Sequence, residues 1–441
     1  MKADRQDDSP QDPIRVDKTQ LARLRQLGPL LEKLPKDCST TLGSRTRTGT
    51  GPDNRTLTYA HYAGLVLLAT LHPAIGSLRD IQRASQLKRV RQALTPPGAA
   101  PAPRASLGSL SESVRVFDPQ LLQPIIAELA GRLPKSYHPG RQPPHQVPLE
   151  LLRKAVIVDG SCLRGLSRII EAASRPPASA KESGKAQWRM HMQFRPLANL
   201  PDPTHPAVLT PDRTGPDDDE RAVLARHLEP GCVYIGDRGF EKYDLLNRIT
   251  GAGSDYVIRV QQRSMRVIEA RVLTPEAMAA GVVQDELVTA VRSHPSDAAL
   301  THTVRRVVIV PPAHTRSASR TGSASKPPAP DPIVLLTSLA DVPAEVLGAV
   351  YRLRWMIETF FRFFKHVLGL HRLLSTRPEG VQIQVAMGII AALLIALACG
   401  RPLGRTGTFA LQMFLSGMAD EDEALDLLSR DAREQARRKK P

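Results

Sequence analysis

The chain has 441 residues, and its 60 lysines and arginines against 44 acids give a formal net charge of +16. This length is too great for one ordinary domain and suits two or three. The positive excess favours a polyanionic partner, either nucleic acid or an anionic membrane surface. The four cysteines form no C-x-x-C pair, which argues against a disulfide framework and a zinc ribbon and favours a reducing cytoplasm.

The N-terminal third of the chain predicts helices. Residues 1–18 are polar and acidic without an apolar signal region, and we expect them to be disordered. Apolar residues then recur at helical spacing in four segments: 19–34, 59–72, 76–94 and 118–133. Asp118 followed by Pro119 is typical of a helix start, whereas the proline- and alanine-rich stretch 95–106 predicts a linker or long loop.

A run of basic residues stands out in this helical region. It comprises Arg79, Arg83, Lys88, Arg89 and Arg91. Such a run suits contact with the phosphates of duplex DNA. A solvated helix face is an equally good interpretation for any one of these residues.

The pattern changes near residue 150. Apolar, β-branched runs at 154–160, 187–194, 232–240 and 255–260 predict strands, and the segments between them, 217–228 and 242–249, predict helices. Alternating strands and helices indicate an α/β core. From 261 to 335 strand-like runs dominate, interrupted by a polar stretch at 313–332 that predicts a flexible loop, and a helix is expected at 342–361.

One uncharged stretch, residues 381–400, is about as long as a bilayer span. It contains Gln382 and Gln384, is rich in alanine and has no second segment like it. We therefore expect a buried core helix and no membrane partner; a lone membrane anchor is the alternative.

Two aspartates share one context. Asp159 and Asp237 each end an apolar run and precede a turn. Acids at the carboxyl ends of neighbouring strands in an α/β sheet lie at the edge where sites are built. Each could instead cap its turn, which is the more common fate of Asp159 taken alone and an even alternative for Asp237.

A single acid, Glu358, lies among bases and aromatic residues in 351–370. On one continuous helix, Tyr351, Arg354, Glu358 and Lys365 fall within about 60° of one another, with the apolar residues opposite. A solvated helix face would carry more acids, so the pattern favours phosphate binding. Together with the two aspartates, Glu358 could hold two Mg²⁺ ions about 4 Å apart for in-line displacement at phosphorus.

The spacing Tyr351-x₂-Arg354-x₃-Glu358-x₆-Lys365 resembles the Y-R-E-K signature of bacterial insertion-sequence transposases of the family numbered four. The stretches ending in Asp159 and Asp237 look like the two aspartate motifs of these DDE enzymes. The resemblance implies a ribonuclease-H-like core that binds two Mg²⁺ ions, with Mn²⁺ as a substitute, through Asp159, Asp237 and Glu358. It also implies that Tyr351, Arg354 and Lys365 contact DNA phosphates and that Arg238 touches DNA.

The resemblance further implies a domain order. A helical basic DNA-binding region (1–150) precedes the first part of the catalytic core (151–260), a β-rich insertion (261–335), the C-terminal core helices (336–400) and a helical basic tail (401–441). Some members use a tryptophan of the insertion in forming a hairpin intermediate. Here the two tryptophans, Trp188 and Trp355, lie outside it, which removes the support for that route.

The expected function is cut-and-paste DNA transposition. The partners are double-stranded DNA, as terminal inverted repeats and as target, and a second copy in the DNA complex, with the protein in the bacterial cytoplasm at the nucleoid. The alternatives are a ribonuclease-H-like nuclease without strand transfer and a non-catalytic DNA-binding inhibitor of transposition. The histidines show no ligand spacing, and Ser161 and Cys162 have no base nearby in the sequence, so zinc and nucleophilic catalysis are not expected.

Overall fold

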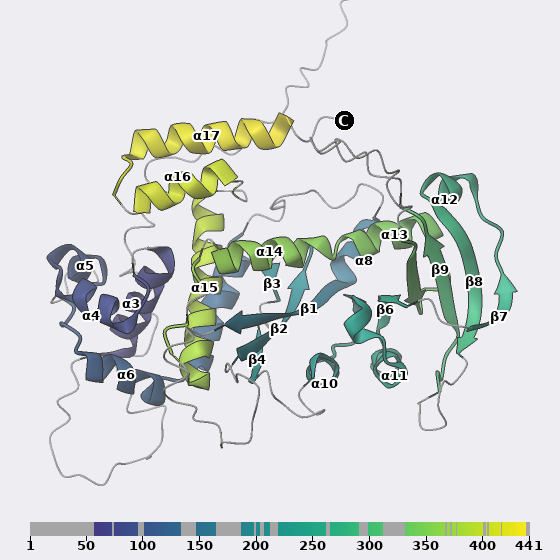
Figure 1. The fold of residues 1–441 in the computed structure, drawn as a ribbon, viewed down its shortest axis with the longest axis horizontal. Helices are drawn as coiled ribbons and strands as arrows, with labels where there is room; N and C mark the ends of the chain where they lie inside the picture. Colours follow the sequence, from purple (N-terminus) through teal and green to yellow (C-terminus); the bar gives the residue numbers. More distant parts are fainter. Residues whose placement is uncertain are drawn as a thin grey trace, which may run out of the picture. The chain divides into compact units, whose positions relative to one another are not determined.

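The computed structural model describes residues 57–72, 75–95, 101–133, 147–164, 187–197, 200–202, 207–211, 219–261, 265–290, 299–311, 331–366, 368–370, 373–375, 377–399, 403, 405–415 and 417–437 (Figure 1). The helix expected at 19–34 and almost all of the loop expected at 313–332 lie outside these residues. The chain divides into two compact units. One comprises Met1–Gly140, Arg164–Ala173 and Arg362–Pro441, and the other Arg141–Leu163 and Ser174–Phe361.

The described part of the first unit is helical. Its elements are α3 (Tyr59–Leu71), α4 (Leu78–Gln86), α5 (Lys88–Ala93), α6 (Leu107–Val116), the 3-10 helix η1 (Pro119–Leu122), α7 (Gln123–Gly131), α15 (Pro378–Cys399), α16 (Arg405–Leu415) and α17 (Glu421–Arg437). Helix α15 packs against α3, α6, η1 and α7, while α16 packs against α17. Residues from the two ends of the sequence therefore share one core.

Helix α15 is the uncharged stretch seen in the sequence. It is the one described helix that is long and apolar enough to cross a membrane by length and composition, and 83% of its most apolar window is buried inside the protein. The expectation of a buried core helix is confirmed.

Local signals set the boundaries of several of these helices. Asp118 accepts a hydrogen bond from the backbone N–H of Gln120 and Pro119 follows it, as the sequence predicts for a helix start. The helix expected over 76–94 is divided in two. Leu87 is extended, with φ −74° and ψ 132°, and separates α4 from α5. Arg91 of α5 then donates from Nε to the carbonyl of Ala102 at 2.6 Å, so this side chain ties α5 to the following loop.

The second unit is built on a ten-stranded sheet. Its strands are β1 (Ala155–Arg164), β2 (Gln187–Arg195), β3 (Leu200–Pro201), β4 (Val208–Pro211), β5 (Val233–Gly236), β6 (Asp255–Val260), β7 (Met265–Ala270), β8 (Val282–Ala290), β9 (Val304–Ile309) and β10 (Ile333–Thr337). The order is β3-β2-β1-β5-β6-β10-β9-β8-β7, with β4 paired to β2. Strands β1, β5 and β6 are parallel, and β10, β9, β8 and β7 continue the sheet with antiparallel pairing.

Helices lie on both faces of this sheet, because its central strands are apolar on both sides. The helices of this unit are α8 (Leu149–Lys154), α10 (Glu220–Arg226), α11 (Tyr243–Gly251), α12 (Pro275–Ala279), α13 (Ala344–Arg352) and most of α14 (Trp355–His366). On one face, residues of α10 and α11 share a buried core with Val156, Tyr234 and Tyr256. Helix α13 packs against β5, β6 and β8, and Gly348 lies beside the side chain of Ile309. Figure 1 shows α10 and α11 on the side of the sheet opposite α13.

Candidate active site

The site begins with two neighbouring parallel strands. Ile157 of β1 pairs in register with Ile235 of β5, so Asp159 and Asp237, two residues further along each strand direction, come to the same edge of the sheet. Asp159 accepts a hydrogen bond from the N–H of Gly160 at 2.8 Å. Asp237 ends its run as predicted and caps the 3-10 helix η3 (Arg238–Phe240), accepting from the N–H of Gly239 at 2.8 Å.

Glu358 reaches this edge from a helix, although not from the continuous helix expected over 342–361. That expectation is wrong: α13 ends at Arg352, and α14 begins at Trp355. Between them the backbone makes tighter turns of the 3-10 type, in which the N–H of Arg354 donates to the carbonyl of Tyr351 at 3.1 Å. At this break the side chain of Leu353 is buried, with 1% exposed, and the guanidinium of Arg354 lies near the acids of the site.

The guanidinium of Arg354 connects the distant acids. Its Nη2 lies 2.6 Å from Oε1 of Glu358, and its Nη1 lies 4.0 Å from Oδ2 of Asp159. All three side chains are largely buried, with exposed fractions of 14% for Arg354, 17% for Asp159 and 29% for Glu358. Strand β1 and helix α14 are thereby held together by opposite charges.

Asp159 lies where negative charge is disfavoured. Burial raises the pKa of this carboxyl to about 7, and the charges of Asp237 and Glu220 act in the same direction. The N–H of Gly160 and the charge of Arg354 favour the ionised form and only partly offset them. Without a cation, the folded protein therefore favours the protonated form of Asp159 more strongly than water does.

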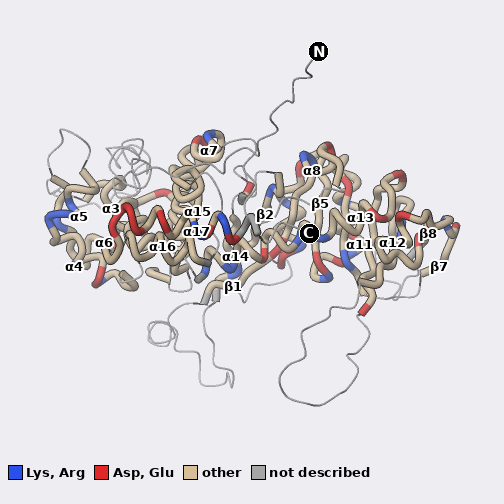
Figure 2. Tube along the Cα trace, turned by 90° about the horizontal axis from the view of Figure 1, so that it is seen from above, with Lys and Arg blue, Asp and Glu red and all other residues tan. Residues whose placement is uncertain are grey.

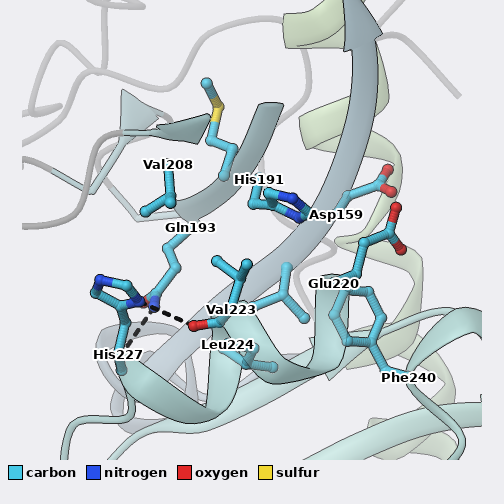
Figure 3. A pocket seen from close by; sticks show the side chains of 11 residues that line it. Asp159, His191, Gln193, Val208, Glu220, Val223, Leu224, His227 and Phe240 are labelled. Carbon is cyan, nitrogen blue, oxygen red and sulfur yellow. Dashed lines mark hydrogen bonds between the residues drawn. The ribbon is translucent and has the colours of Figure 1, made fainter. Parts of the chain in front are cut away.

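Glu220 is a residue that the sequence analysis did not single out. It begins α10 directly after Asp219, which caps the helix. Oε1 of Glu220 accepts a hydrogen bond from Nη1 of Arg189 on β2 at 2.7 Å. Figure 3 shows the carboxylates of Asp159 and Glu220 at the same side of a pocket, which also includes His191, Gln193 and His227. The acids before α10 were the sequence signal, but nothing local distinguishes Glu220 from Asp217, Asp218 and Asp219.

The remaining predicted phosphate contacts fall in different surroundings. Tyr351 is 7% exposed, and its buried hydroxyl has no hydrogen-bond partner among the described residues. Its ring centroid lies 5.9 Å from Cζ of Arg354. Arg238 is exposed on η3, next to Asp237. Lys365 is half-buried, seven residues after Glu358 on α14, and belongs to the other compact unit.

The basic run of the N-terminal region lies on α4 and α5. Arg79, Arg83, Lys88 and Arg89 are exposed, and Leu87 between the two helices is 59% exposed. Figure 2 marks the basic residues of α5. These two short helices thus offer four cations to solvent around an apolar side chain.

The donor set of the strand edge suits a hard divalent cation. Carboxylate oxygens are what Mg²⁺ and Mn²⁺ prefer, and Asp159, Asp237 and Glu358 supply them from three elements. Within the described part of the chain, no three His, Cys, Asp or Glu side chains are gathered closely enough to hold a metal ion as they stand. Arg354 instead provides the positive charge between Asp159 and Glu358. The residues fit the cation by their chemistry, provided that Arg354 gives way to it.

Comparison with known families shows to which family the chain belongs. A family model described as a transposase DDE domain matches residues 150–394, which is more than half of the chain. The chain belongs to the transposase DDE domain family. The match includes Asp159, Asp237, Glu358 and Glu220, together with the β-rich stretch between Asp237 and Glu358.

Relatives of this transposase-family chain include proteins of insertion sequence elements. It is 28% identical over 240 residues to the transposase for insertion sequence element IS421 of Escherichia coli, covering 49% of this chain and 62% of the relative. The InsL protein of insertion sequence element IS186A of Escherichia coli (strain K12) matches to the same extent. The y4zB protein of Sinorhizobium fredii (strain NBRC 101917 / NGR234) is 25% identical over 245 residues, covering 53% and 61%. The chain thus aligns with about three fifths of each relative.

A solved structure, the piggyBac transposase synaptic complex with hairpin DNA, aligns with 97% of this chain and 83% of its own at 13% identity and a TM-score of 0.38. Likeness at that level carries no argument about the site.

Proposed function

We propose that this protein is a cut-and-paste DNA transposase of the insertion-sequence family numbered four, with a ribonuclease-H-like core. Its family membership supports transposition as the general activity. The observation that carries the proposal is the bridge formed by Arg354 between Asp159 and Glu358, residues far apart in the sequence. A strand-end aspartate and a helix glutamate share one guanidinium beside a second strand-end aspartate, Asp237.

Asp159, Asp237 and Glu358 would hold two Mg²⁺ ions, or Mn²⁺ in their place. When bound, such ions activate an attacking oxygen and stabilise a leaving oxygen at phosphorus. The reaction is hydrolysis of one phosphodiester in each strand at both ends of the element, in which water adds to phosphorus and the broken bond leaves a hydroxyl at the end of the element. Attack of that hydroxyl on target DNA exchanges one phosphodiester for another and joins the strands.

Cationic side chains orient the DNA in this proposal. Arg354 can fork a phosphate with two parallel N–H groups once it leaves the acids. Arg238 is exposed one residue from Asp237 and is suited to the same backbone. Tyr351 supports Arg354 from α13, and Lys365 contacts a phosphate further along the strand.

The proposal includes a division of labour along the chain. Residues 1–150 bind the terminal inverted repeats through the exposed cations of α4 and α5, 151–260 and 336–400 carry the catalytic core, 261–335 form the insertion and 401–441 a basic tail. Two copies join two ends in the DNA complex, within the bacterial cytoplasm.

The test uses a labelled DNA end carrying the inverted repeat that flanks the coding sequence, the purified full chain and Mg²⁺. Asp159→Asn, Asp237→Asn and Glu358→Gln are each expected to abolish cleavage while binding to the end persists. Asp244→Asn is the matched control, because Asp244 is an exposed acid of α11 paired with Arg248. Cleavage at the parent's rate by any of the first three variants removes that residue from the site.

The same assay separates the two alternative functions. A nuclease without strand transfer cleaves the end but does not join it to a target duplex. An inhibitor of transposition binds the end and neither cleaves nor joins it. Cleavage and joining together are expected for the parent chain.

A further inference from the structure

We propose that Glu220 is a fourth carboxylate of the cation site, reaching it from the face of the sheet opposite α14. The inference rests on the proposed function, because it adds a residue to the site formed by Asp159, Asp237 and Glu358. Glu220 would be a ligand of a divalent cation, and Arg189 a positioning residue that orients it.

The position of the Glu220 carboxylate carries the inference. Built at Gly160, a Cβ atom would lie 2.3 Å from Oε1 of Glu220 and 2.8 Å from its Cδ. The carboxylate therefore occupies the space that any other side chain at position 160 would fill. Gly160 directly follows Asp159, so Glu220 meets the edge of the sheet beside the first aspartate.

The second oxygen of Glu220 points toward the other aspartate. A Cβ atom built at Gly239 would lie 3.0 Å from Oδ1 of Asp237 and 3.3 Å from Oε2 of Glu220. Both oxygens are thus within 3.3 Å of one point, on residues from different elements. The two oxygens are therefore separated by no more than the sum of these distances, and like charges in such proximity favour a proton or cation between them.

The alternation of β1 lets acids approach this strand end from both faces of the sheet. Successive residues of β1 point to opposite faces, so Asp159 and Gly160 address different sides. Asp159 meets Arg354, which precedes α14, whereas Gly160 lies under Glu220 of α10. Because Gly160 has no side chain, the acid from α10 can approach the strand end where the acid from α14 arrives.

Arg189 fixes one oxygen and leaves the other available. It donates from β2 to Oε1 of Glu220 at 2.7 Å, while Oε2 faces the Asp237 side. The pair is partly exposed, 38% for Arg189 and 20% for Glu220. An oxygen oriented by an outer partner is the usual arrangement for carboxylates that bind metals.

A separate observation indicates that the neighbouring pocket accepts a hydrogen-bond donor. Gln193 is 7% exposed and lines the same pocket as Asp159 and Glu220 (Figure 3). Its Nε2 donates to the carbonyl of His227 at 3.0 Å, but its buried Oε1 has no partner among the described residues. Buried acceptors are nearly always satisfied, so a donor such as a bound water fits in this pocket.

The test measures binding of Mn²⁺ alone to the full chain without DNA, by loss of the free Mn²⁺ signal in electron paramagnetic resonance. Glu220→Gln keeps the shape and one acceptor for Arg189 but removes the charge, and we expect Mn²⁺ affinity to fall about tenfold or more. Gly160→Ala keeps every carboxylate yet pushes that of Glu220 aside, and a smaller loss in the same direction is expected. Thermal melting in EDTA establishes that each variant is folded.

Glu229→Gln is the matched control. Glu229 also pairs with an arginine of β2, since Nη2 of Arg195 lies 2.6 Å from its Oε2, but it does not adjoin Gly160 or Gly239. Its Mn²⁺ affinity is expected to equal that of the parent. If Glu220→Gln binds Mn²⁺ like the parent, Glu220 is only the structural partner of Arg189 and the inference is overturned.

Asp159→Asn separates failure of the inference from failure of the proposed function. Loss of Mn²⁺ binding in Asp159→Asn but not in Glu220→Gln rejects the fourth carboxylate and keeps the site. Parent-like binding by both variants rejects the cation site itself.

Discussion

At the scale of single residues, protonation of Asp159 makes the stability of the folded protein depend on pH. Burial and the nearby carboxylates raise the pKa of Asp159 to about 7 in the folded protein without a cation. The unfolded chain has the ordinary value of about 3.9. Because the folded state holds the proton more tightly, the free energy of unfolding decreases as pH rises between about 4 and about 7.

Asp159→Asn should therefore stabilise the metal-free protein at alkaline pH. In EDTA at pH 8 we expect its melting temperature to exceed that of the parent. Its free energy of unfolding should be higher by on the order of 1–3 kcal/mol after allowance for partial exposure. The gap should shrink as pH falls to 5, where the parent carboxyl is protonated. Thermal melting at the two pH values measures it, and a variant that melts below the parent at pH 8 would contradict the assignment.

Arg354→Lys tests whether this side chain does more than neutralise acids. Lysine keeps the charge but cannot present two parallel N–H groups to a phosphate, or span Asp159 and Glu358 as the guanidinium does. We expect cleavage of a labelled end to fall at least about tenfold, with little change in melting temperature. A loss of cleavage that merely follows a lower melting temperature would reduce Arg354 to a structural ion pair.

Some residues of the candidate site can be picked out from the sequence, and Glu220 cannot. Asp159 and Asp237 stand out as candidates because each ends an apolar run, and Glu358 because it is the one acid in a basic stretch. Glu220 does not, since its approach depends on the missing side chain of Gly160 and on Arg189 from another strand. Such contacts arise only when distant segments pack.

At the scale of elements, most strands and helices follow from periodicity, and their interruptions do not. Strands β1, β5 and β6 lie where apolar runs predict them. The break between α13 and α14 was not predictable, because the local sequence is helical throughout. Burial of Leu353 and the contacts of Arg354 outweigh local helix propensity there.

The turn between α12 and β8 provides a test of backbone geometry. Gly281 has φ of +84°, and a Cβ atom there would lie 2.4 Å from the carbonyl oxygen of Val310. Gly281→Ala should destabilise the protein by about 2–4 kcal/mol through strain and this clash. Gly253→Ala is the comparison, since Gly253 has φ of +75° but its nearest neighbour is Pro230 Cβ at 3.9 Å. It should cost about 1–2 kcal/mol; equal losses in denaturant melts would show that no clash exists.

At the scale of the whole molecule, the N-terminal helices and the C-terminal α15 share a core. Because α15 packs against α3, α6, η1 and α7, the DNA binding proposed for residues 1–150 is best measured on the full chain. Composition predicts a polyanionic partner, but it does not predict which lysine and arginine side chains contact that partner. That depends on the exposure of α4 and α5.

Replacing Arg79, Arg83, Lys88 and Arg89 together by alanine should weaken binding to the terminal repeat and flatten its salt dependence. For every phosphate that the variant no longer neutralises, the slope of log K against log salt decreases by about 0.9. Binding is measured by fluorescence anisotropy over a range of salt concentrations. The charge-matched control replaces four exposed arginines elsewhere: Arg248, Arg266, Arg430 and Arg433. Equal slopes for both variants would mean that net charge alone, and not this surface, binds DNA.

The central claim is that Asp159, Asp237 and Glu358 form one cation site at an edge of the sheet. Anomalous diffraction from a crystal of the full chain containing Mn²⁺ tests it most directly. We predict a manganese peak within about 2.5 Å of carboxylate oxygens of Asp159 and of Asp237 or Glu358, with Arg354 moved away from between Asp159 and Glu358. Manganese peaks found only elsewhere, with Arg354 still bridging these two acids, would contradict the claim.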